Sequence, residues 1–303
     1  MAHQTYDKSV QESNEIRPFQ RYEVVYKKIK HIFLGLFTIV TCTFLILMAI
    51  SVFYFQHLTN TTIHMSDKDL RLKLLHIVGD EDIDNTKSNI LTEYNHSANT
   101  LIAGPNQVSP HVIKALTASE DSLFFYHNGI LPKAIVRAVG QDIFNTESPT
   151  GGSTITQQLV KNQLLTNERT YDRKANELVL SMRAEHVLTK DEIIYTYLNI
   201  VPFGRDHHGS DITGIASASY SLFGKSATNL NIAESAYLIG LLQSPYYYTP
   251  YTEDGSLKPD QEIKISLNRQ HYVLKRMLVE EKITHADFKN AEKYNVQQHL
   301  IAR

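Results

Sequence analysis

A pair of carboxylates beside aromatic and histidine side chains forms the first stretch of the sequence that could do chemistry. It reads Glu120-Asp121-x-x-Phe124-Phe125-x-His127-x-Gly129. A carboxylate among aromatic residues is partly desolvated, which raises its pKa and makes it a usable proton acceptor. The same glutamate also completes a capping box, Thr117-Ala-Ser-Glu120, and the local sequence by itself favours this helix-capping interpretation.

Glycines, hydroxyls and amides gather in a second stretch, which could bind an anion and sugars. It reads Gly151-Gly152-Ser153-Thr154-Ile155-Thr156-Gln157-Gln158-Leu159-Val160-Lys161-Asn162. Glycines followed by hydroxyl residues can open a helix whose free N–H groups face an anion. Gln side chains suit sugar hydroxyls, and Lys161 suits a phosphate. A flexible loop before a capped helix is the alternative, but it does not account for the concentration of Gln157, Gln158, Lys161 and Asn162.

Three further blocks follow. The first, Arg169-x-x-x-Arg173-Lys174-x-x-Glu177, places charged side chains at i,i+4 on one helix face, although an ordinary solvated salt-bridge face has the same pattern. The others run from Phe203-Gly204 to Gly224-Lys225 and from Leu230 to Pro250. By themselves these two are typical of small-residue helix packing and of a helix that ends at a proline.

Helical signals dominate the elements that must position these residues. Thr189-x-x-Glu192 is a capping box before an apolar run, residues 232–242 form an apolar helix that ends near Pro245, and further helices are expected at 261–281 and 285–293. Strand signals are weak. The sequence therefore predicts a mainly α-helical domain.

One long apolar segment, His31 to Phe55, contains no Asp, Glu, Lys or Arg. A helix of that length spans ~37 Å, enough to cross a bilayer core. A buried soluble helix and a signal peptide cleaved near Ala49-Ile50-Ser51 are the alternatives; the length favours an uncleaved anchor. Lys and Arg precede the segment and are missing from 56–66, which predicts a cytoplasmic N-terminus and an extracellular remainder.

Composition adds few constraints. The chain has 303 residues, a formal net charge of −2 that gives no reason to expect nucleic-acid binding, and a single cysteine, so no intramolecular disulfide can form. We expect a cytoplasmic tail that is loosely ordered (1–30), a transmembrane anchor (31–55), a stalk or membrane-proximal segment (56–100), the catalytic domain (101–255) and a C-terminal helical extension (256–303).

Together and in this order, the five blocks closely resemble the motifs of glycosyltransferase family 51. This is the peptidoglycan glycosyltransferase module of class A penicillin-binding proteins and of monofunctional peptidoglycan transglycosylases. The resemblance covers about residues 108–250. It implies a mainly α, lysozyme-like fold with a small membrane-proximal lobe. It also implies an enzyme of the cell membrane that joins lipid II units into β-1,4 glycan strands and releases undecaprenyl diphosphate.

The resemblance also assigns roles. Glu120 is the expected general base, and Glu177 the second catalytic glutamate, which positions substrate or stabilises the diphosphate region with a cation. The substrate-binding residues that it implies are Asp121, Phe124, His127, Ser153, Thr154, Gln157, Gln158, Lys161, Asn162, Arg169, Arg173 and Lys174. A divalent cation, Mg²⁺ or Mn²⁺, near the donor diphosphate is the one cofactor expected. The expected partners are lipid II, the growing lipid-linked chain, the membrane, and cell-wall synthesis or division proteins.

Physical chemistry agrees with this assignment. Diphosphate is a good leaving group that charge neutralisation can assist, whereas the acceptor hydroxyl is a poor nucleophile that needs a base. A muramidase or lytic transglycosylase, and a non-catalytic scaffold, are the competing hypotheses.

No transpeptidase S-x-x-K, S-D-N or K-T-G element is present, so the chain is either monofunctional or a piece of a bifunctional protein. For the adjacent His207 and His208, a loop is a simpler explanation than a zinc site.

Overall fold

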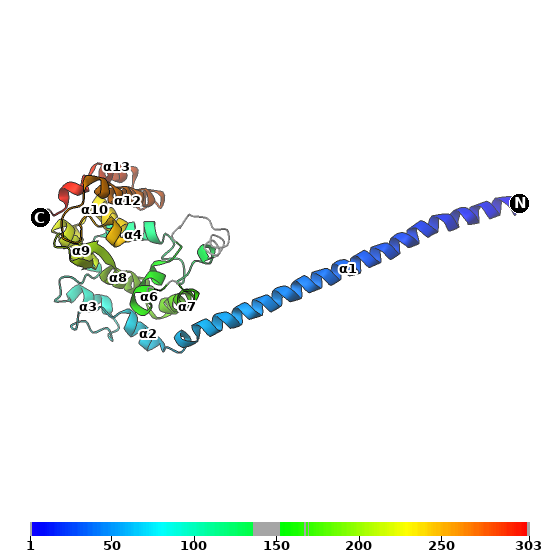
Figure 1. The fold of residues 1–303 in the computed structure, drawn as a ribbon, viewed down its shortest axis with the longest axis horizontal. Coiled ribbons are helices and arrows are strands. Elements are labelled where there is room, and N and C mark those ends of the chain that lie inside the picture. Colours follow the sequence, from blue (N-terminus) through cyan, green and yellow to red (C-terminus); the bar gives the residue numbers. More distant parts are fainter. Residues whose placement is uncertain (1, 136–151, 167, 169, 302–303) are drawn as a thin grey trace. The chain divides into compact units, whose positions relative to one another are not determined.

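The computed structural model describes residues 2–135, 152–166, 168 and 170–301, apart from the side chains of 2–21 and 60–63. It divides into two units, Met1–Asn60 and Thr61–Arg303. Helices make up most of both units (Figure 1), which confirms the prediction of a mainly α-helical protein.

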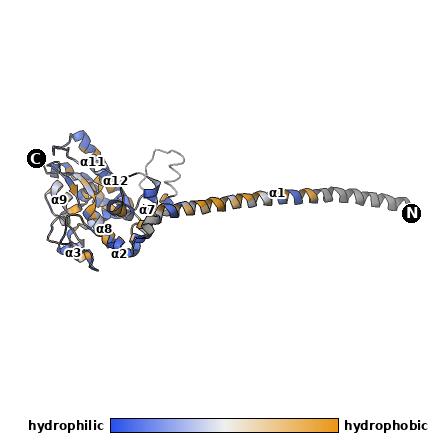
Figure 2. Ribbon diagram, turned by 60° about the horizontal axis from the view of Figure 1, so that its bottom comes forward, coloured by the Kyte–Doolittle hydropathy of each residue, from blue (hydrophilic) through white to orange (hydrophobic). Residues whose placement is uncertain are grey.

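The first unit consists of most of α1 (Ala2–Ile63). Within it, Tyr22–Thr59 is long and apolar enough to cross a membrane, and none of its apolar window is buried inside the protein. Figure 2 shows this stretch of the helix as predominantly hydrophobic. Residues 2–30, which we expected to be loosely ordered, are helical as well. The physical reason is that extending an existing helix costs much less free energy than nucleating one.

The helices of the second unit pack in two sets. The α4 group contains α4 (Pro110–Glu120), α10 (Ile232–Leu241), α12 (Asp260–Val279) and α13 (His285–Lys293). The α6 group contains α2 (Asp67–Leu74), α6 (Ile155–Leu164), α7 (Tyr171–Val187) and α8 (Lys190–Ile200). Helices contact one another within each set, and Figure 1 shows the sets as two neighbouring layers.

Shorter elements complete the second unit. They are α3 (Ile90–His96), α9 (Ile215–Phe223), α11 (Pro245–Tyr248) and 3-10 turns at Pro105–Gln107, Ala227–Asn229 and Val296–His299. Strands β1 (Pro202–Arg205) and β2 (Asp211–Thr213) pair antiparallel, with Gly204 opposite Ile212. This hairpin lies where the sequence showed only a glycine-rich segment.

Helix caps fix where the helices of the site begin. The side chains of Thr154, Thr189 and Asn231 accept hydrogen bonds from the first turns of α6, α8 and α10, each within a capping box. The capping interpretation of Glu120 is wrong. Glu120 is the last residue of α4, and the hydroxyl of Thr117 donates to the carbonyl of Ile113 inside that helix. Glu120 therefore does not take part in a capping box.

The second unit has one hydrophobic core, which reaches beyond the segment that carries the motifs. Leu70, Leu74 and Tyr94 from the expected stalk belong to it, and so do Val273 and Met277 from the expected C-terminal extension. The two ends of the unit therefore help to hold the helices between them in place.

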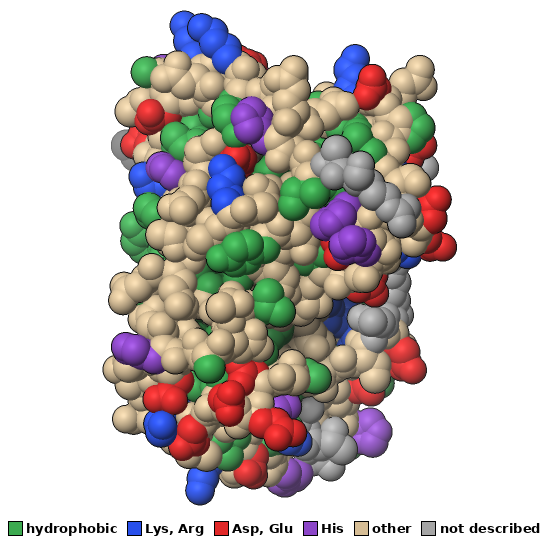
Figure 3. Space-filling model, turned by 90° about the vertical axis from the view of Figure 1, so that its left-hand side faces the viewer, with side chains coloured by type: hydrophobic (Ala, Val, Ile, Leu, Met, Phe, Trp, Pro, Cys, Tyr) green, Lys and Arg blue, Asp and Glu red, His purple; other side chains and the backbone are tan. Residues whose placement is uncertain are grey.

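Polar contacts tie the same elements together. Arg71 on α2 donates two hydrogen bonds to the carboxylate of Glu192 on α8, at 2.6 and 3.0 Å. On the face that Figure 3 displays, Lys and Arg side chains are scattered rather than gathered in one patch, in line with the small net charge.

Two glycines with similar backbone angles allow a matched test of this packing. Gly129 has φ +88°, and a Cβ there would lie 2.3 Å from the carbonyl oxygen of Ser181. Gly79 has φ +85°, and a Cβ there would meet nothing within 4 Å. We expect Gly79→Ala to lower the free energy of unfolding by about 1 kcal/mol, the cost of a left-handed alanine. Gly129→Ala should lower it by roughly 3 kcal/mol or more, because backbone must also move.

Thermal or denaturant unfolding of the detergent-solubilised chain measures both losses. Equal losses for the two variants would show that the contact between residue 129 and α7 does not constrain the fold.

Candidate active site

The carboxylate of Glu120 lies where the α4 group meets the α6 group. Its Oε2 accepts a hydrogen bond from Nε2 of Gln158 on α6, at 3.1 Å. Its Oε1 lies 3.5 Å from Nη2 of Arg269 on α12. The Glu120 side chain is 15% exposed. A single carboxylate thus receives one neutral and one cationic partner, from two different layers of helices.

Burial raises the pKa of Glu120 above the ordinary value of a glutamate. The hydrogen bond from Gln158 and the charge of Arg269 both lower the pKa, while the nearby charge of Asp121 raises it; burial is the largest effect. Oε1 is buried and has no hydrogen-bond partner among the described residues. A carboxylate with a raised pKa and one free oxygen is suited to accept a proton.

Tyr197 determines which way the amide of Gln158 points. The hydroxyl of Tyr197 on α8 donates to Oε1 of Gln158 at 2.7 Å. An amide whose oxygen is held in this way presents its NH₂ group to the other side, where Glu120 lies. Tyr197 is fully buried, so the amide has little freedom to turn over.

The loop after α4 is fastened by the second carboxylate of the motif. Oδ2 of Asp121 accepts hydrogen bonds from Nε2 of His127 at 2.8 Å and from the backbone N–H of Ile155 at 3.0 Å. Because Nδ1 of His127 accepts from the N–H of Gly129, the ring proton lies on Nε2. Asp121 therefore joins the end of α4 to the beginning of α6.

A partly buried ion pair also supports that loop. Nζ of Lys190 donates to a carboxylate oxygen of Glu185 at 2.8 Å and to the carbonyl of His127 at 2.7 Å, and it lies 4.6 Å from the ring centroid of Phe124. The hydroxyl of Thr156 also donates to Glu185, at 2.6 Å. Phe124 is fully buried. The side chains of Asp121, Phe124 and His127 are thus engaged inside the protein and position the residues around them.

Two residues of the glycine-rich block are likewise engaged in the fold. Thr154 caps α6, its hydroxyl donates to the carbonyl of Gly129 at 2.6 Å, and Oε1 of Gln157 accepts from the N–H of Thr154. Both side chains are buried. Gln158 is half-buried and faces Glu120. Within this block, Thr154 and Gln157 therefore support the fold, whereas Gln158 belongs to the site.

The basic residues gather around Glu177. Arg173 donates to one oxygen of this carboxylate at 2.5 Å, and Lys174 donates to the other. Lys174 also contacts the hydroxyl of Ser153 at 3.1 Å. The Glu177 side chain is only 3% exposed, whereas its two partners reach towards solvent. Arg169, which we also expected here, lies outside the described residues.

These contacts do not fit a divalent cation on Glu177. Both of its oxygens already hold a cationic side chain. Over the ranges that the structure describes, no three His, Cys, Asp or Glu side chains are grouped so that they could hold a metal ion. A metal would have to displace Arg173 or Lys174 before it could reach this carboxylate.

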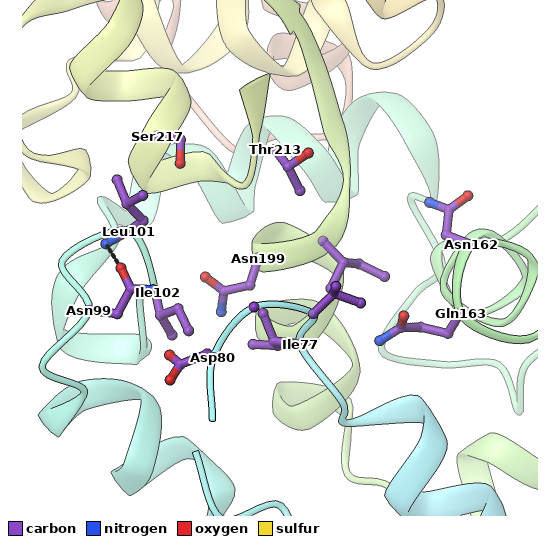
Figure 4. A pocket seen from close by; sticks show the side chains of 13 residues that line it. Ile77, Asp80, Asn99, Leu101, Ile102, Asn162, Gln163, Asn199, Thr213 and Ser217 are labelled. Carbon is purple, nitrogen blue, oxygen red and sulfur yellow. Dashed lines mark hydrogen bonds between the residues drawn. The ribbon is translucent and has the colours of Figure 1, made fainter. Parts of the chain in front are cut away.

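The remaining substrate-binding candidates lie further along α6. Lys161 is half-buried and makes no ion pair with the residues described, and Asn162 is exposed. Asn162 also lines a cavity of about 410 Å³, drawn in Figure 4. Several amides of this cavity are already used within the fold: Asn99 accepts from the N–H of Leu101, and Asn199 is bonded to both backbone groups of Ala103. Neither Glu120 nor Glu177 is among its lining residues.

Arg269 is a site residue that the sequence did not single out for chemistry. It belonged only to an expected C-terminal helix. A signal that could have found it is the presence of an Arg beside core-facing positions of that helix. Its relation to Glu120, however, depends on how separate helices pack.

Comparison with known proteins supports the family that the motifs indicated. A family model described as Transglycosylase matches residues 87–278. Penicillin-binding protein 1A of Escherichia coli (strain K12) is 38% identical over 184 residues, covering 60% of this chain and 20% of the relative. Penicillin-binding protein 1A of Aquifex aeolicus (strain VF5) is 38% identical over 186 residues, covering 61% of this chain and 24% of the relative.

Among solved structures, the crystal structure of Penicillin-Binding Protein 1A from Haemophilus influenzae aligns with a TM-score of 0.29 and 28% identity. The alignment covers 36% of this chain and 14% of the Haemophilus influenzae chain. The chain thus spans about a quarter or less of the length of the curated relatives it is compared with here.

The family match covers more than half of the chain and contains every residue placed around Glu120 and Glu177 above. The chain therefore belongs to the transglycosylase family, the peptidoglycan glycosyltransferases that its motifs resemble.

Proposed function

We propose that this protein is a peptidoglycan glycosyltransferase that polymerises lipid II into β-1,4 glycan strands for cell-wall biogenesis. The observation that carries the proposal is the carboxylate of Glu120, which burial makes more basic and which has one oxygen that accepts no hydrogen bond from the described residues. Family membership supplies the reaction to which such a base belongs.

In the proposed step, Glu120 takes the proton from the 4-hydroxyl of the acceptor sugar. The hydroxyl oxygen attacks the anomeric carbon of the donor, the growing lipid-linked chain. As the new glycosidic bond forms, the bond to the diphosphate breaks and undecaprenyl diphosphate leaves with the bonding electron pair. Attack from the opposite face inverts the configuration from α to β. The proton on Glu120 is then released to water, which restores the base.

The leaving diphosphate needs cations rather than an acid. Arg173 and Lys174 reach towards solvent beside Ser153, and we propose that they receive the diphosphate there, together with Lys161 on α6. Glu177 bonds to both Arg173 and Lys174 and so keeps two like charges side by side. This contact supports an ion-pair role for Glu177 rather than a metal-binding one.

The anchor has a role in the same reaction. Both substrates carry a lipid, so a catalytic unit tethered by α1 meets them at the membrane surface. The basic flank, which includes Lys27, Lys28 and Lys30, supports a single-pass arrangement with a cytoplasmic N-terminus and an extracellular catalytic unit. Proteins of cell-wall synthesis or division are the expected partners.

The first prediction concerns the base. Glu120→Gln keeps the size of the side chain but cannot accept the proton, so we expect polymer formation from lipid II to fall by at least about 100-fold. Glycan products on a gel measure it. Glu93→Gln, at a partly exposed ion pair with Lys87, is the matched control and should retain activity. Cleavage of preformed glycan by the wild-type chain would instead favour a lytic enzyme.

The second prediction concerns pH. Glu120 works only when it is ionised, and its pKa lies above the ordinary 4.5. The value of kcat/KM should therefore fall as pH is lowered, and its acid limb should have its midpoint above 4.5. Initial rates with lipid II across a pH series measure the limb. A midpoint at or below 4.5 would argue against a buried base.

The third prediction separates the two glutamates. In Glu177→Gln the two cations lose the carboxylate between them, so we expect KM for lipid II to rise about tenfold, equivalent to about 1.4 kcal/mol of binding. The acid limb should keep the wild-type midpoint, because Glu120 is unaltered. A loss of kcat at unchanged KM would place Glu177 in the chemical step instead.

A further inference from the structure

The two oxygens of Glu120 differ in their surroundings. Oε2 is held by Gln158, whereas Oε1 has no hydrogen-bond partner among the described residues and faces Arg269 across 3.5 Å. That distance is too long for a strong hydrogen bond but short for two opposite charges. Arg269 therefore acts on Glu120 through its charge and leaves the buried Oε1 without a hydrogen bond.

Packing holds Arg269 at this distance. Its guanidinium carbon lies 4.3 Å from the ring centroid of Tyr272, and its side chain is 14% exposed. Two turns further along α12, Nε of Arg276 donates to the carbonyl of Ala118 in the last turn of α4, at 3.2 Å. α12 is thus tied to the end of α4 beside Glu120, which limits how far the guanidinium can move.

Glu120 needs such a cation because most of its surroundings oppose its charge. Burial does so, and so does the neighbouring Asp121. Glu120 is also the last residue of α4, at the helix end where the backbone dipole disfavours a negative charge. Gln158 from α6 is neutral, and Tyr197 from α8 is a phenol whose own pKa burial raises well above the usual value, so it is neutral too.

We propose that Arg269 is a positioning residue of this active site: it keeps Glu120 ionised without itself donating a hydrogen bond to Oε1, which is left for the proton of the acceptor. The proposal rests on the proposed function for its role in the reaction. Its electrostatic part concerns Glu120 alone and can be measured without substrate.

The experiment compares Arg269→Met, Arg269→Lys and Lys275→Met in the full chain in detergent micelles. Lys275 is the matched control, since it is an exposed cation on the same helix. Two readouts are used. One is the acid limb of kcat/KM with lipid II, and the other is the infrared carboxyl band of protonated Glu120, identified by its absence in Glu120→Gln.

In Arg269→Met we expect both midpoints to rise by about 1 to 3 pH units, the usual effect of a close opposite charge. At a pH below the acid limb, the rate should fall about tenfold for each pH unit by which the midpoint rises. Arg269→Lys keeps the charge and should bring the midpoint most of the way back to the wild-type value, and Lys275→Met should leave it within about half a pH unit of that value. If Arg269 had only a structural role, Arg269→Met and Arg269→Lys would both be less stable, and Arg269→Lys would not bring the midpoint back towards the wild-type value.

Unchanged midpoints in Arg269→Met would overturn the proposal. If that variant does not fold, Arg269→Gln, which is also neutral but polar, serves the same comparison. If the carboxyl band shifts as expected while the wild-type chain forms no polymer, the proposed function fails and the effect of Arg269 on Glu120 stands. If polymer forms and the midpoints do not move, the proposed function stands and the proposed effect of Arg269 on Glu120 fails.

Discussion

The carboxylate of Glu120, buried where two layers of helices meet, is the constraint on which the rest of the site depends. A buried carboxylate is stable only with partners, and a base is useful only if one of its oxygens stays open. The protein meets both needs by dividing the partners between layers, with Gln158 from the α6 group and Arg269 from the α4 group. A shift between the layers would alter the contact with Gln158, because Glu120 and Arg269 both belong to the α4 group.

The contacts around the loop after α4 limit such a shift. Asp121 joins the end of α4 to the first backbone N–H of α6, and Thr154 bonds across to the carbonyl of Gly129. Lys190 reaches the same loop from α8. Many motif residues are therefore buried, although the resemblance placed them in substrate binding. Their contacts keep Glu120 and Gln158 in a fixed position relative to each other, which is also a requirement of catalysis.

The two glutamates expected to be catalytic have opposite surroundings. Burial dominates at Glu120 and makes it more basic, whereas Glu177 is bonded to Arg173 and Lys174. One carboxylate is thus suited to exchange a proton, and the other to hold two cations in place. This difference follows from what each carboxylate touches, since both residues are buried glutamates.

The sequence by itself determined the elements and the family. Apolar periodicity and capping boxes located α8, α10, α12 and α13 to within a few residues, because these signals depend only on neighbours along the chain. The order of the motifs singled out Asp121 and Gln158, two of the residues that lie around Glu120. The tertiary structure alone decided that Glu120 ends a helix instead of capping one, that Asp121 and His127 face inward, and that Arg269 lies beside Glu120. The physical reason is that burial and long-range ion pairs arise from the packing of separate helices, which spacing along the chain does not encode.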